Sequence, residues 1–512
     1  MRRDEVKRPS SLGGAGRCMS ASIEPRYNLF IGGAEVPASG GGTRTLLDPA
    51  TNDPLTTVAF GTADDARFAM ESAERAFRES AWAGDDGAKR GRTLYRLARL
   101  IEERAEPLAL LETRNMGKPL KEARGDVAYV VRTFEYVAGL ADKIEGETIP
   151  VPGPRFDFTL REPLGVTVHI APWNYPLLLA MRSVAPALAA GNAAVLKPAS
   201  ATPLTALALA RLAKEAGIPD GILNVVVGGG TDVGEALVSD RRGRSVAFTG
   251  SGEVGQRIAE LAGRRVIPVT LELGGKSPVI VFPDADLDRA AKGIAFGIFG
   301  NAGQMCWAGS RLLVARPVRD ELLAKVRALA EAYHLGPGTD PATEMGPLVA
   351  ADHLARVVGF IEEARGAGAR IVTGGVKVDE PSLARGNFVR PTVVADAPPD
   401  ARIVREEVFG PVLTVQEFDE ADEAVRLAND SRYGLFAALW TRDLVRAHTV
   451  ARQLEAGMVS VNEPPNSYPQ TPFGGFKDSG IGFEQGTDTV RQFTRRKNVL
   501  VNLGAAKPRR SA

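Results

Sequence analysis

One cysteine in the sequence stands where a reactive thiol could work. Cys306 lies within "GNAGQMCWAGSR" (residues 300–311), and the only other cysteine, Cys18, falls in a Gly/Ser/Arg-rich stretch near the N-terminus. Such a stretch is a poor partner for a structural disulfide, so we expect a free thiol at position 306. A thiolate is a strong nucleophile, but a thiol with a pKa of about 8.5 needs a local field to ionise near neutral pH. The alternative for an isolated cysteine is a small buried hydrophobic residue.

Glycine-rich turns form a second chemical signal. The stretch "SVAFTGSGEVGQRIAELA" places Gly250, Gly252 and Gly255 between an apolar run and a helical pattern. In that context G-x-G-x-x-G binds a dinucleotide phosphate, although a tight turn without a ligand is an equal alternative. A Rossmann fold would place a ribose-binding acid roughly 20 residues later, near Glu272. Residues 228–230 form another glycine turn.

These residues need rigid elements to bring them together. From Gly165 onward, short apolar runs alternate with helical segments, among them "GVTVHIA", "AAVLKP", "SVAFTGS" and "SPVIVF", and a second such series follows Cys306. Uninterrupted apolar runs are typical of strands buried on both faces, so the rhythm predicts βαβ units with parallel sheets. The expected fold class is α/β, with two parallel-sheet domains.

The chain before these strands has a helical pattern. One face of the segment "DDARFAMESAERAF" is apolar and carries Ala66, Ala69, Met70, Ala73, Ala76 and Phe77. A second pattern, "LYRLARLIEERAEPLALLETRNMG", stops near Gly117, because glycine and the nearby Pro119 favour the end of a helix. We therefore expect helices to dominate the first part of the chain.

Composition limits the partners and the location. The 63 basic and 62 acidic residues leave a net charge of +1, which provides no field to attract nucleic acid or an anionic membrane. No apolar run reaches the roughly 18 residues that span a bilayer, and no signal peptide is recognisable, so we expect a cytoplasmic protein with a small-molecule partner. Residues 1–25 are predicted to be a disordered tail, and the 18 residues before Met19 an upstream extension without function.

The histidines give no sign of a metal. His169, His334, His353 and His448 form no spaced cluster, and no Cys/His or carboxylate set has metal-ligand spacing. We expect neither a structural nor a catalytic metal. His169 should be a buried strand residue, and the other three should lie on helix surfaces.

Seven motifs occur in one consistent order along the chain. They are "APWNYP" (171–176), "LKPASATP" (196–203), "FTGSGEVG" (248–255), "LELGGKSP" (271–278), "GQMCWAGSR" (303–311), "EEVFGPV" (406–412) and "PFGGFKDSG" (472–480). From about residue 27 to about residue 503 the chain resembles the aldehyde dehydrogenase superfamily, of the NAD(P)-dependent hydrolytic type. The resemblance implies that an aldehyde is oxidised to a carboxylic acid.

The resemblance also implies roles for four residues. Cys306 resembles the nucleophile that forms a thiohemiacetal and then a thioester. Asn174 resembles the donor that stabilises the tetrahedral oxyanion, although an asparagine before Tyr-Pro also suits a turn. Glu272 resembles the base that activates water, and Glu484 stands where many members have a second glutamate that relays protons.

Two alternative activities remain at this point. Branches of the superfamily that transfer the acyl group to coenzyme A lack the glutamate at the position of Glu272, so its presence favours a free acid. A cofactor-independent cysteine hydrolase would need a histidine near Cys306, which no local motif supplies.

The same resemblance implies a nicotinamide dinucleotide site, formed by Trp173, Lys197, Ser200, Gly230, Gly250, Ser251, Gly255, Leu273, Glu407 and Phe409. Many NAD-specific members carry a glutamate at the position of Ser200, where it grips the ribose 2′-hydroxyl and repels a 2′-phosphate. A small hydroxyl beside Lys197 removes that repulsion. We therefore expect either NAD or NADP to be accepted.

The residues expected to contact the aldehyde are Tyr175, Leu179, Arg182, Met305, Trp307 and Tyr468. Arg182 could attract an anionic semialdehyde, although the second arginine expected for that group is Gly300 here. It could equally pair with an acid at the domain boundary. Trp307, Tyr468 and Phe476 leave aromatic or quaternary-amine aldehydes open.

Domain boundaries follow from the resemblance. It implies a Rossmann-like dinucleotide-binding domain over residues 26–141 and 162–274, and a catalytic domain over residues 275–478. Residues 142–161 and 479–505 should form a small β element, in which "IEGETIPVPGPRFDFTLREP" pairs with "TRRKNVLVNL". Exposed apolar strands of this kind need a covering partner, so we expect a homodimer or homotetramer.

Overall fold

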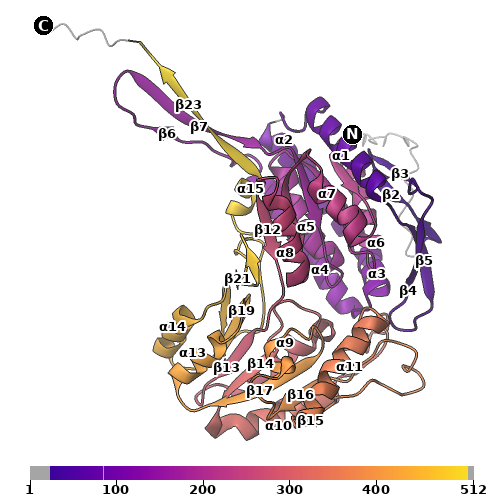
Figure 1. The fold of residues 1–512 in the computed structure, drawn as a ribbon, viewed down its shortest axis with the longest axis vertical. Helices are drawn as coiled ribbons and strands as arrows, with labels where there is room; N and C mark the ends of the chain where they lie inside the picture. The colour runs from indigo at the N-terminus through magenta and orange to yellow at the C-terminus, as the bar shows by residue number, and fades with distance from the viewer. Residues whose placement is uncertain (1–22, 85, 505–512) are drawn as a thin grey trace, which may run out of the picture.

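The first domain is built around a mixed sheet of eight strands (Figure 1). The structure, a computed structural model, describes residues 23–84 and 86–504. The sheet has the order β22-β12-β11-β8-β9-β10-β2-β3, and the five strands from β12 to β10 run parallel. Its strands are β22 (Gly480–Ile481), β12 (Val269–Glu272), β11 (Gly243–Thr249), β8 (Val166–Ile170), β9 (Ala193–Lys197), β10 (Leu223–Val225), β2 (Leu29–Ile31) and β3 (Ala34–Val36).

Two groups of helices cover this sheet. The first group consists of α1 (Ala63–Glu79), α7 (Glu235–Ser239) and α8 (Gly252–Gly263), in which α7 packs between α1 and α8. The other has α5 (Pro176–Ala189) and α6 (Leu204–Glu215) on the sheet, with the outer helices α2 (Gly87–Glu103), α3 (Ala105–Met116) and α4 (Leu120–Leu140) packed against them. The central strands are therefore buried on both faces, as their uninterrupted apolar runs predict.

The second domain has a seven-stranded sheet in the order β15-β16-β17-β14-β13-β19-β20, parallel except for β15. The strands are β15 (Arg370–Thr373), β16 (Thr392–Ala395), β17 (Val412–Phe418), β14 (Arg311–Ala315), β13 (Pro278–Val281), β19 (Phe436–Trp440) and β20 (Met458–Val461). Its helices are α9 (Leu287–Phe299), α10 (Arg319–Ala332), α11 (Ala351–Gly366), α12 (Arg402–Arg405), α13 (Ala421–Asn429) and α14 (Leu444–Gln453). Two separate apolar clusters pack on this sheet, so both of its faces are covered.

A three-stranded arm projects from the first domain (Figure 1). Strand β7 (Arg155–Pro163) lies in the middle, between β6 (Thr148–Ile149) and β23 (Thr494–Asn502), and all its pairings are antiparallel. The short helix α15 (Asp488–Gln492) leads into β23. Large apolar side chains on the arm are exposed, among them Phe156, Leu160 and Leu500.

The α/β fold class with two parallel-sheet domains and a small β element is confirmed, and helices dominate the first part of the chain as expected, but some local details differ. The first part of the chain also contains strands: β2 and β3 join the eight-stranded sheet, and β1 (Arg26–Tyr27), β5 (Pro54–Ala59) and β4 (Thr43–Leu47) form a small sheet of their own. The second helical pattern is broken at Arg104 into α2 and α3 before it ends at Gly117, whose φ is 98°. Strand β22, predicted to belong to the arm, extends the eight-stranded sheet beside β12.

The N-terminal tail lies mostly outside the described residues. Residues 1–22, including Cys18, are among those that the structure does not describe. Residues 23–25, which the predicted tail included, are folded: Ile23 packs against the core of the first domain, and the Glu24 carboxylate pairs with Arg211 at 2.5 Å. Residues 23–25 therefore do not belong to a disordered tail, and the rest of the predicted tail lies outside the described residues.

Candidate active site

The loop that carries Cys306 has an unusual backbone. It follows α9, and three consecutive residues, Asn301, Ala302 and Gly303, are left-handed with φ values of 45°, 53° and 70°. A Cβ atom at Gly303 would lie 2.1 Å from the carbonyl oxygen of Gly410, so only glycine fits there. This conformation turns the chain sharply and leaves the Cys306 thiol partly exposed.

Asn174 is hydrogen-bonded to the same loop. Its amide nitrogen donates to the carbonyl oxygen of Gln304 at 2.9 Å, and the Asn301 amide donates to the carbonyl oxygen of Asn174 at 3.0 Å. Asn174 lies in the turn before α5, so the contact joins the two domains across the site. An amide nitrogen carries two hydrogens, and one of them remains for a further acceptor.

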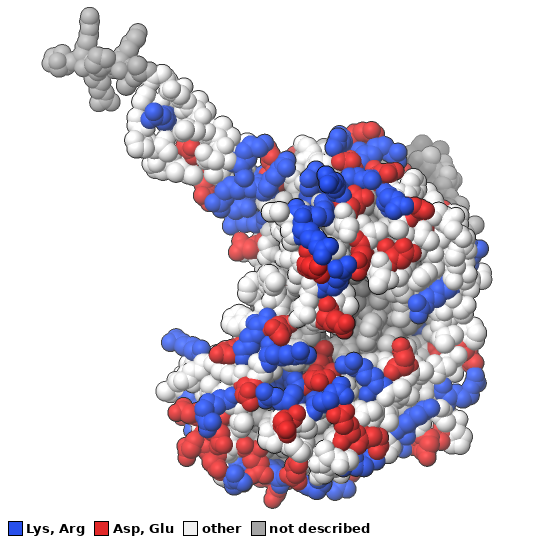
Figure 2. Space-filling view, in the orientation of Figure 1, with Lys and Arg blue, Asp and Glu red and all other residues white. Residues whose placement is uncertain are grey.

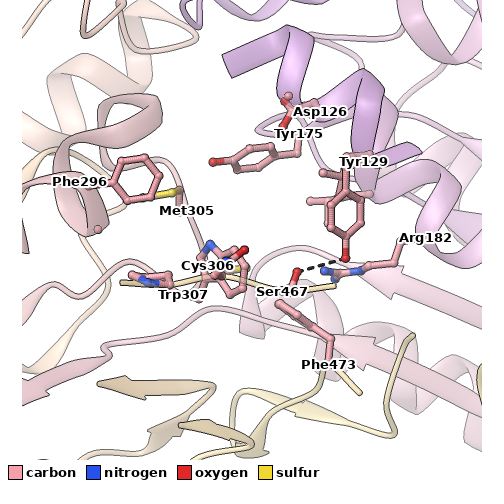
Figure 3. A pocket seen from close by; sticks show the side chains of 16 residues that line it. Asp126, Tyr129, Tyr175, Arg182, Phe296, Met305, Cys306, Trp307, Ser467 and Phe473 are labelled. Carbon is pink, nitrogen blue, oxygen red and sulfur yellow. Dashed lines mark hydrogen bonds between the residues drawn. The ribbon is translucent and has the colours of Figure 1, made fainter. Parts of the chain in front are cut away.

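Two cavities meet at Cys306. The first, which we call the aromatic cavity, has a volume of about 310 Å³ and is lined largely by aromatic and apolar side chains, including Tyr129, Tyr175, Phe296, Met305, Trp307 and Phe473 (Figure 3). The second, the cleft cavity, has a volume of about 260 Å³ and is lined by residues that include Trp173, Asn174, Glu272, Glu407 and Phe409. Cys306 and Leu179 line both cavities.

The cavities lie at the junction of the two domains. Figure 2 shows the molecule hollowed between its lobes, with acidic and basic side chains interspersed on both. A polar cavity of about 530 Å³ borders the cleft cavity and shares Ser251, Leu273, Gly274 and Glu407 with it. A molecule of extended shape can therefore reach Cys306 along the cleft while another occupies the aromatic cavity.

Glu272 is a buried carboxyl group with no hydrogen-bond partner. It ends β12, is 2% exposed and lines the cleft cavity. Neither of its carboxyl oxygens has a partner within the described part of the chain. Burial raises its pKa well above the usual range, Arg182 opposes this effect, and Glu484 adds to it. These are the properties of a group that can take and release a proton.

Arg182 and Glu484 form a buried ion pair beside Glu272. Their side chains are 4% and 6% exposed, and Arg182 Nε donates to the Glu484 carboxylate. The Arg182 guanidinium also lies over the Phe473 ring, with 4.0 Å from its carbon to the ring centroid. Its Nη2 atom is buried and has no partner among the described residues. Of the two interpretations of Arg182, the structure supports pairing with an acid, and Glu484 is held by that pair.

The environment of Cys306 favours the neutral thiol. Burial raises the pKa of Cys306 to about 12, Arg182 lowers it, and the nearby Glu407 and Glu272 raise it further. Arg182 is therefore a cation shared by the thiol and two carboxyl groups.

Glu407 is seated on the two glycines that follow Glu272. The backbone N–H of Gly275 donates to the Glu407 carboxylate at 2.9 Å, and a Cβ atom on Gly274 would lie 2.2 Å from its other oxygen. A Cβ atom on Gly275 would come within 2.5 Å of the Cys306 carbonyl oxygen. The glycines thus allow Glu407, β12 and the cysteine loop to approach closely. Burial raises the pKa of Glu407 to about 7.

Aromatic rings close the other wall of the cleft cavity. The Trp173 ring meets Phe409 edge-on at 5.2 Å and His353 at 5.1 Å between centroids. A ring nitrogen of His353 is 2.7 Å from the carbonyl oxygen of Phe409, whose own φ is 61°. His353, predicted to be a surface residue, is instead part of this wall.

The more distant polar residues surround the ends of β9 and β10. The Lys197 ammonium has one long contact, 3.5 Å to the carbonyl oxygen of Pro198, and burial lowers its pKa to about 8. The Ser200 hydroxyl donates to the carbonyl oxygen of Gly228 at 2.8 Å. Space is open above Gly230, where an added Cβ atom would meet nothing within 4 Å. A buried, weakly bonded ammonium beside open space fits the hydroxyl groups of a ribose.

The three glycines in and after the turn into α8 differ in whether packing requires them. A Cβ atom on Gly250 would lie 2.5 Å from the Phe248 ring, and one on Gly255 would lie 2.5 Å from Leu273. Gly252 has open space around it, so packing does not require glycine there. Ser251 caps α8 by accepting from the backbone N–H of Val254 at 3.4 Å.

The sequence pattern of the aldehyde dehydrogenase family matches residues 36–499. The chain belongs to the aldehyde dehydrogenase family.

Individual relatives of this aldehyde dehydrogenase support the same family membership. The chain is 43% identical to the hydroxyisobutyraldehyde dehydrogenase of Mycolicibacterium austroafricanum over 491 residues, covering 95% of this chain and 97% of the relative. It is similar to betaine aldehyde dehydrogenase of Staphylococcus aureus in complex with NAD+, at 38% identity and a TM-score of 0.92, covering 95% and 97% of the two chains. An NAD+ complex of an aldehyde dehydrogenase from Bacillus cereus has 41% identity and a TM-score of 0.91, covering 94% and 97%.

The activity follows from this membership. The protein is an NAD(P)-dependent aldehyde dehydrogenase that oxidises an aldehyde to the carboxylic acid, with a cofactor of the NAD type. The family thereby favours a dehydrogenase over the cofactor-independent hydrolase. Such a hydrolase would need a histidine near Cys306. His353 borders the cleft cavity with Cys306, but one of its ring nitrogens is engaged by the Phe409 carbonyl oxygen.

The structure brings most of the predicted aldehyde dehydrogenase residues together around the three cavities. Tyr468 is 45% exposed and does not line the aromatic cavity, although Asn466 and Ser467 do. The other predicted residues that line none of the three cavities are Lys197, Ser200, Gly230, Gly255 and Glu484. Several contributors were missed, among them Asp126, Tyr129, Phe296 and Phe473 in the aromatic cavity and His353 and Arg356 in the cleft cavity. Asp126 and Phe296 lie on helical stretches away from the seven motifs, and only long-range packing shows their place.

Among the described residues, His169 has a structural role, and neither a metal-binding cluster nor a membrane-spanning helix is found. His169 is buried between the hydroxyl groups of Thr167 and Ser183, at 2.8 and 3.0 Å, and burial lowers its pKa to about 3. Within residues 23–84 and 86–504, no cluster of three or more His, Cys, Asp or Glu side chains could hold a metal ion. Over the same ranges, no helix is both long and apolar enough to cross a membrane.

Proposed function

We propose that Cys306 is the nucleophile of this aldehyde dehydrogenase, that Asn174 is the oxyanion donor and that Glu272 is the base. One observation carries the proposal: the Cys306 thiol stands where the aromatic cavity and the cleft cavity meet. An aldehyde in the first cavity and a dinucleotide in the second would therefore both reach the same sulfur atom.

The first step joins sulfur to carbon. The partly exposed Cys306 thiol releases its proton to water in the cleft, and its sulfur attacks the aldehyde carbon. The carbonyl oxygen becomes an oxyanion that accepts hydrogen bonds from the Cys306 backbone N–H and the free N–H of Asn174. NAD(P)+, when bound, would supply the hydride acceptor. Collapse of the oxyanion expels hydride from the carbon to that acceptor, and the acyl group stays on Cys306 as a thioester.

The second step releases the acid. Glu272 takes a proton from a water molecule, whose oxygen attacks the thioester carbon and breaks the carbon–sulfur bond. The unpartnered oxygens of Glu272 are free to receive that proton, and the nearby Arg182 favours the ionised form that can accept it. Glu484 pairs with Arg182, so in this proposal it tunes that cation and relays protons only when the pair opens.

We infer that the preferred aldehyde is uncharged and carries a second oxygen atom near the carbonyl group. The charged groups at the aromatic cavity are already compensated, because Arg182 pairs with Glu484 and Asp126 pairs with Lys118 at 2.5 Å. Arg182 reaches Glu484 through Nε, so a terminal nitrogen of its guanidinium can donate to a hydroxyl or ether oxygen. The hydroxylated aldehyde in the name of the Mycolicibacterium relative supports this class.

The aromatic walls of the cavity also admit the quaternary amine in the name of the Staphylococcus relative. The guanidinium at the wall weighs against a cationic substrate, because like charges repel. An anion would gain little from this guanidinium, because Glu484 already pairs with it.

We propose that NADP is accepted alongside NAD, because Ser200 contributes no negative charge near Lys197. The Ser200 proton is already donated to Gly228, so the support is the missing repulsion and not a new bond. We also propose the domain boundaries at residues 141, 162 and 274 set out above, with β22 kept in the first domain, and a homodimer or homotetramer formed through the arm. A cytoplasmic location and the absence of nucleic-acid partners stay predictions.

A panel of aldehydes tests these proposals. Wild-type protein is assayed for NADH and NADPH formation with 2-hydroxyisobutyraldehyde and with pivaldehyde, in which a methyl group replaces the 2-hydroxyl. Cys306→Ala should abolish reduction of the cofactor with every aldehyde, and undiminished turnover in this variant would overturn the assignment of the nucleophile.

The role of Arg182 is tested by the ratio of kcat/KM for the two aldehydes. Wild-type protein should prefer hydroxyisobutyraldehyde by about tenfold or more, as one hydrogen bond to a charged group would provide. Arg182→Met combined with Glu484→Gln removes both members of the ion pair and should bring the ratio near unity, since any effect on Glu272 acts on both aldehydes alike. A ratio that is unchanged in the double variant would contradict the proposal.

A further inference from the structure

A glutamate of the first domain holds the backbone of the cysteine loop. Glu122 lies in the first turn of α4, and its two carboxyl oxygens are 3.3 and 3.1 Å from the backbone N–H nitrogen of Asn301. Asn301 belongs to the second domain and precedes Cys306 by five residues. The contact therefore crosses between the domains directly behind the nucleophile.

The residue that Glu122 contacts is the centre of the loop. The Asn301 carbonyl oxygen accepts from Gln304 Nε2 at 2.9 Å, and its amide donates to the Asn174 carbonyl oxygen at 3.0 Å. Asn301 thus connects Glu122 with Asn174 and Gln304, whose side-chain oxygen accepts from the backbone N–H of Val349 at 2.9 Å. Displacement of Asn301 would disturb the proposed nucleophile and the proposed oxyanion donor together.

The loop needs such a contact because its backbone is strained. A non-glycine residue in the left-handed region is strained, and Asn301 and Ala302 are both in that region. A hydrogen bond to a charged acceptor is stronger than one to a neutral acceptor, so the Glu122 carboxylate can offset part of this strain.

We propose that Glu122 is a positioning residue that keeps residues 301–303 left-handed and thereby holds Cys306 in line with Asn174. This inference rests on the proposed role of Cys306 as the nucleophile.

Neighbouring acids extend the same support to Asn174. Glu112 in α3 accepts from the backbone N–H of Leu177 at 3.4 Å and from the Thr205 hydroxyl at 2.7 Å, which fixes the start of α5 directly after the Asn174 turn. Lys118 lies between these acids, 2.5 Å from Asp126 and 3.9 Å from Glu112, with its ammonium 3.8 Å from the centroid of the Tyr175 ring.

The charges around Glu122 favour a tight contact. Burial raises the pKa of Glu122 to about 7, while Lys118 and the Asn301 N–H lower it. Asp126 raises this pKa and Lys121 lowers it. Removing a carboxyl group from water costs free energy. Lys118 and the Asn301 N–H offset this cost for Glu122 beside the cysteine loop.

Three variants separate positioning from general stability. Glu122→Ala removes the acceptor, Glu122→Asp keeps the charge but draws it back by one methylene group, and Glu122→Gln keeps an oxygen at the same distance. Arg124→Ala is the matched control. Arg124 lies near Glu122 in α4, and its replacement breaks only an exposed ion pair with Glu106 of α3. The readouts are kcat, KM, the thermal midpoint and the rate of iodoacetamide alkylation of Cys306, followed by peptide mass spectrometry.

We expect Glu122→Ala and Glu122→Asp to lower kcat by about tenfold to a hundredfold, as a misplaced reacting group does, with KM within about twofold. Alkylation of Cys306 should change in both variants, and Glu122→Gln should restore most of kcat. Unchanged kcat and alkylation in Glu122→Ala, or a Gln variant as impaired as the Ala variant, would overturn the inference. Failure of the proposed function is distinct, since it appears as turnover in Cys306→Ala.

Discussion

Arg182 and Glu484 form an ion pair that is almost completely buried, although 302 positions separate them in the chain. Arg182 comes from α5, and Glu484 follows the edge strand β22. The pair lies against Phe473 and acts on the electrostatics of both Glu272 and Cys306. The reactive groups therefore share a single cation whose charge is already partly neutralised.

Glu484→Gln should change both stability and the pH profile. Loss of one partner leaves a buried charge uncompensated, at a cost of about 3–5 kcal/mol in the free energy of unfolding. Glu484 raises the pKa of Glu272, so its removal lowers that pKa and the base stays ionised to lower pH. The acid limb of the kcat profile should therefore move to lower pH, and an acid limb that stays in place would count against Glu272 as the titrating base.

Glu272→Gln should separate oxidation from hydrolysis. An amide cannot take the proton from water, so kcat should fall by roughly 10²- to 10⁴-fold. The first turnover should still give about one equivalent of reduced cofactor per subunit, and mass spectrometry should find the acyl group on Cys306. Glu260→Gln, a change of an exposed glutamate on α8, is the control. Slow turnover without any acylated Cys306 would contradict the assignment.

Asn174→Ala should slow the reaction without silencing the thiol. The variant loses the proposed oxyanion donor, which typically costs about 10²- to 10³-fold in rate. Iodoacetamide alkylation develops no oxyanion, so the alkylation rate of Cys306 should fall far less than kcat. If both rates fall equally, the main function of Asn174 is its bond to Gln304.

Ser200→Glu should make the enzyme selective for NAD. A carboxylate at this position would repel a 2′-phosphate and bond to a 2′-hydroxyl, so kcat/KM with NADP should fall by about tenfold or more while that with NAD is retained. Ser200→Ala, which loses only the bond to Gly228, should leave the ratio of the two cofactors nearly unchanged. Steady-state kinetics with both cofactors measure that ratio, and no shift in Ser200→Glu would refute the proposed determinant.

Leu500→Asp should break the association of subunits. Leu500 lies on β23 of the arm and is 56% exposed in the single chain, as are other large apolar residues nearby. A covered apolar strand cannot accommodate a charge, so sedimentation velocity should detect smaller species than in the wild type. Lys497→Ala, a change of an exposed residue on the same strand, should not alter the species observed. An unchanged oligomer in Leu500→Asp would place the interface elsewhere.

Local patterns predicted much of the fold because they report local physics. The parallel strands are uninterrupted apolar runs since both of their faces are covered, and Gly117 ends a helix because it takes a left-handed backbone. Strands β2, β3 and β22 escaped prediction because they are only two or three residues long and owe their pairing to neighbours distant in the chain.

For the site, the seven motifs indicated a cysteine nucleophile, a glutamate base and a dinucleotide cleft through their resemblance to the aldehyde dehydrogenase superfamily, because the chemistry restricts which side chains can serve. Only the tertiary structure decided how those groups are engaged: Arg182 with Glu484, Ser200 with Gly228, and Glu122 with the backbone of Asn301. Each of these contacts joins segments that lie far apart in the chain and that no local periodicity of the sequence relates. Their geometry depends on how separate strands, helices and loops pack, so it emerges only when both domains are folded against each other.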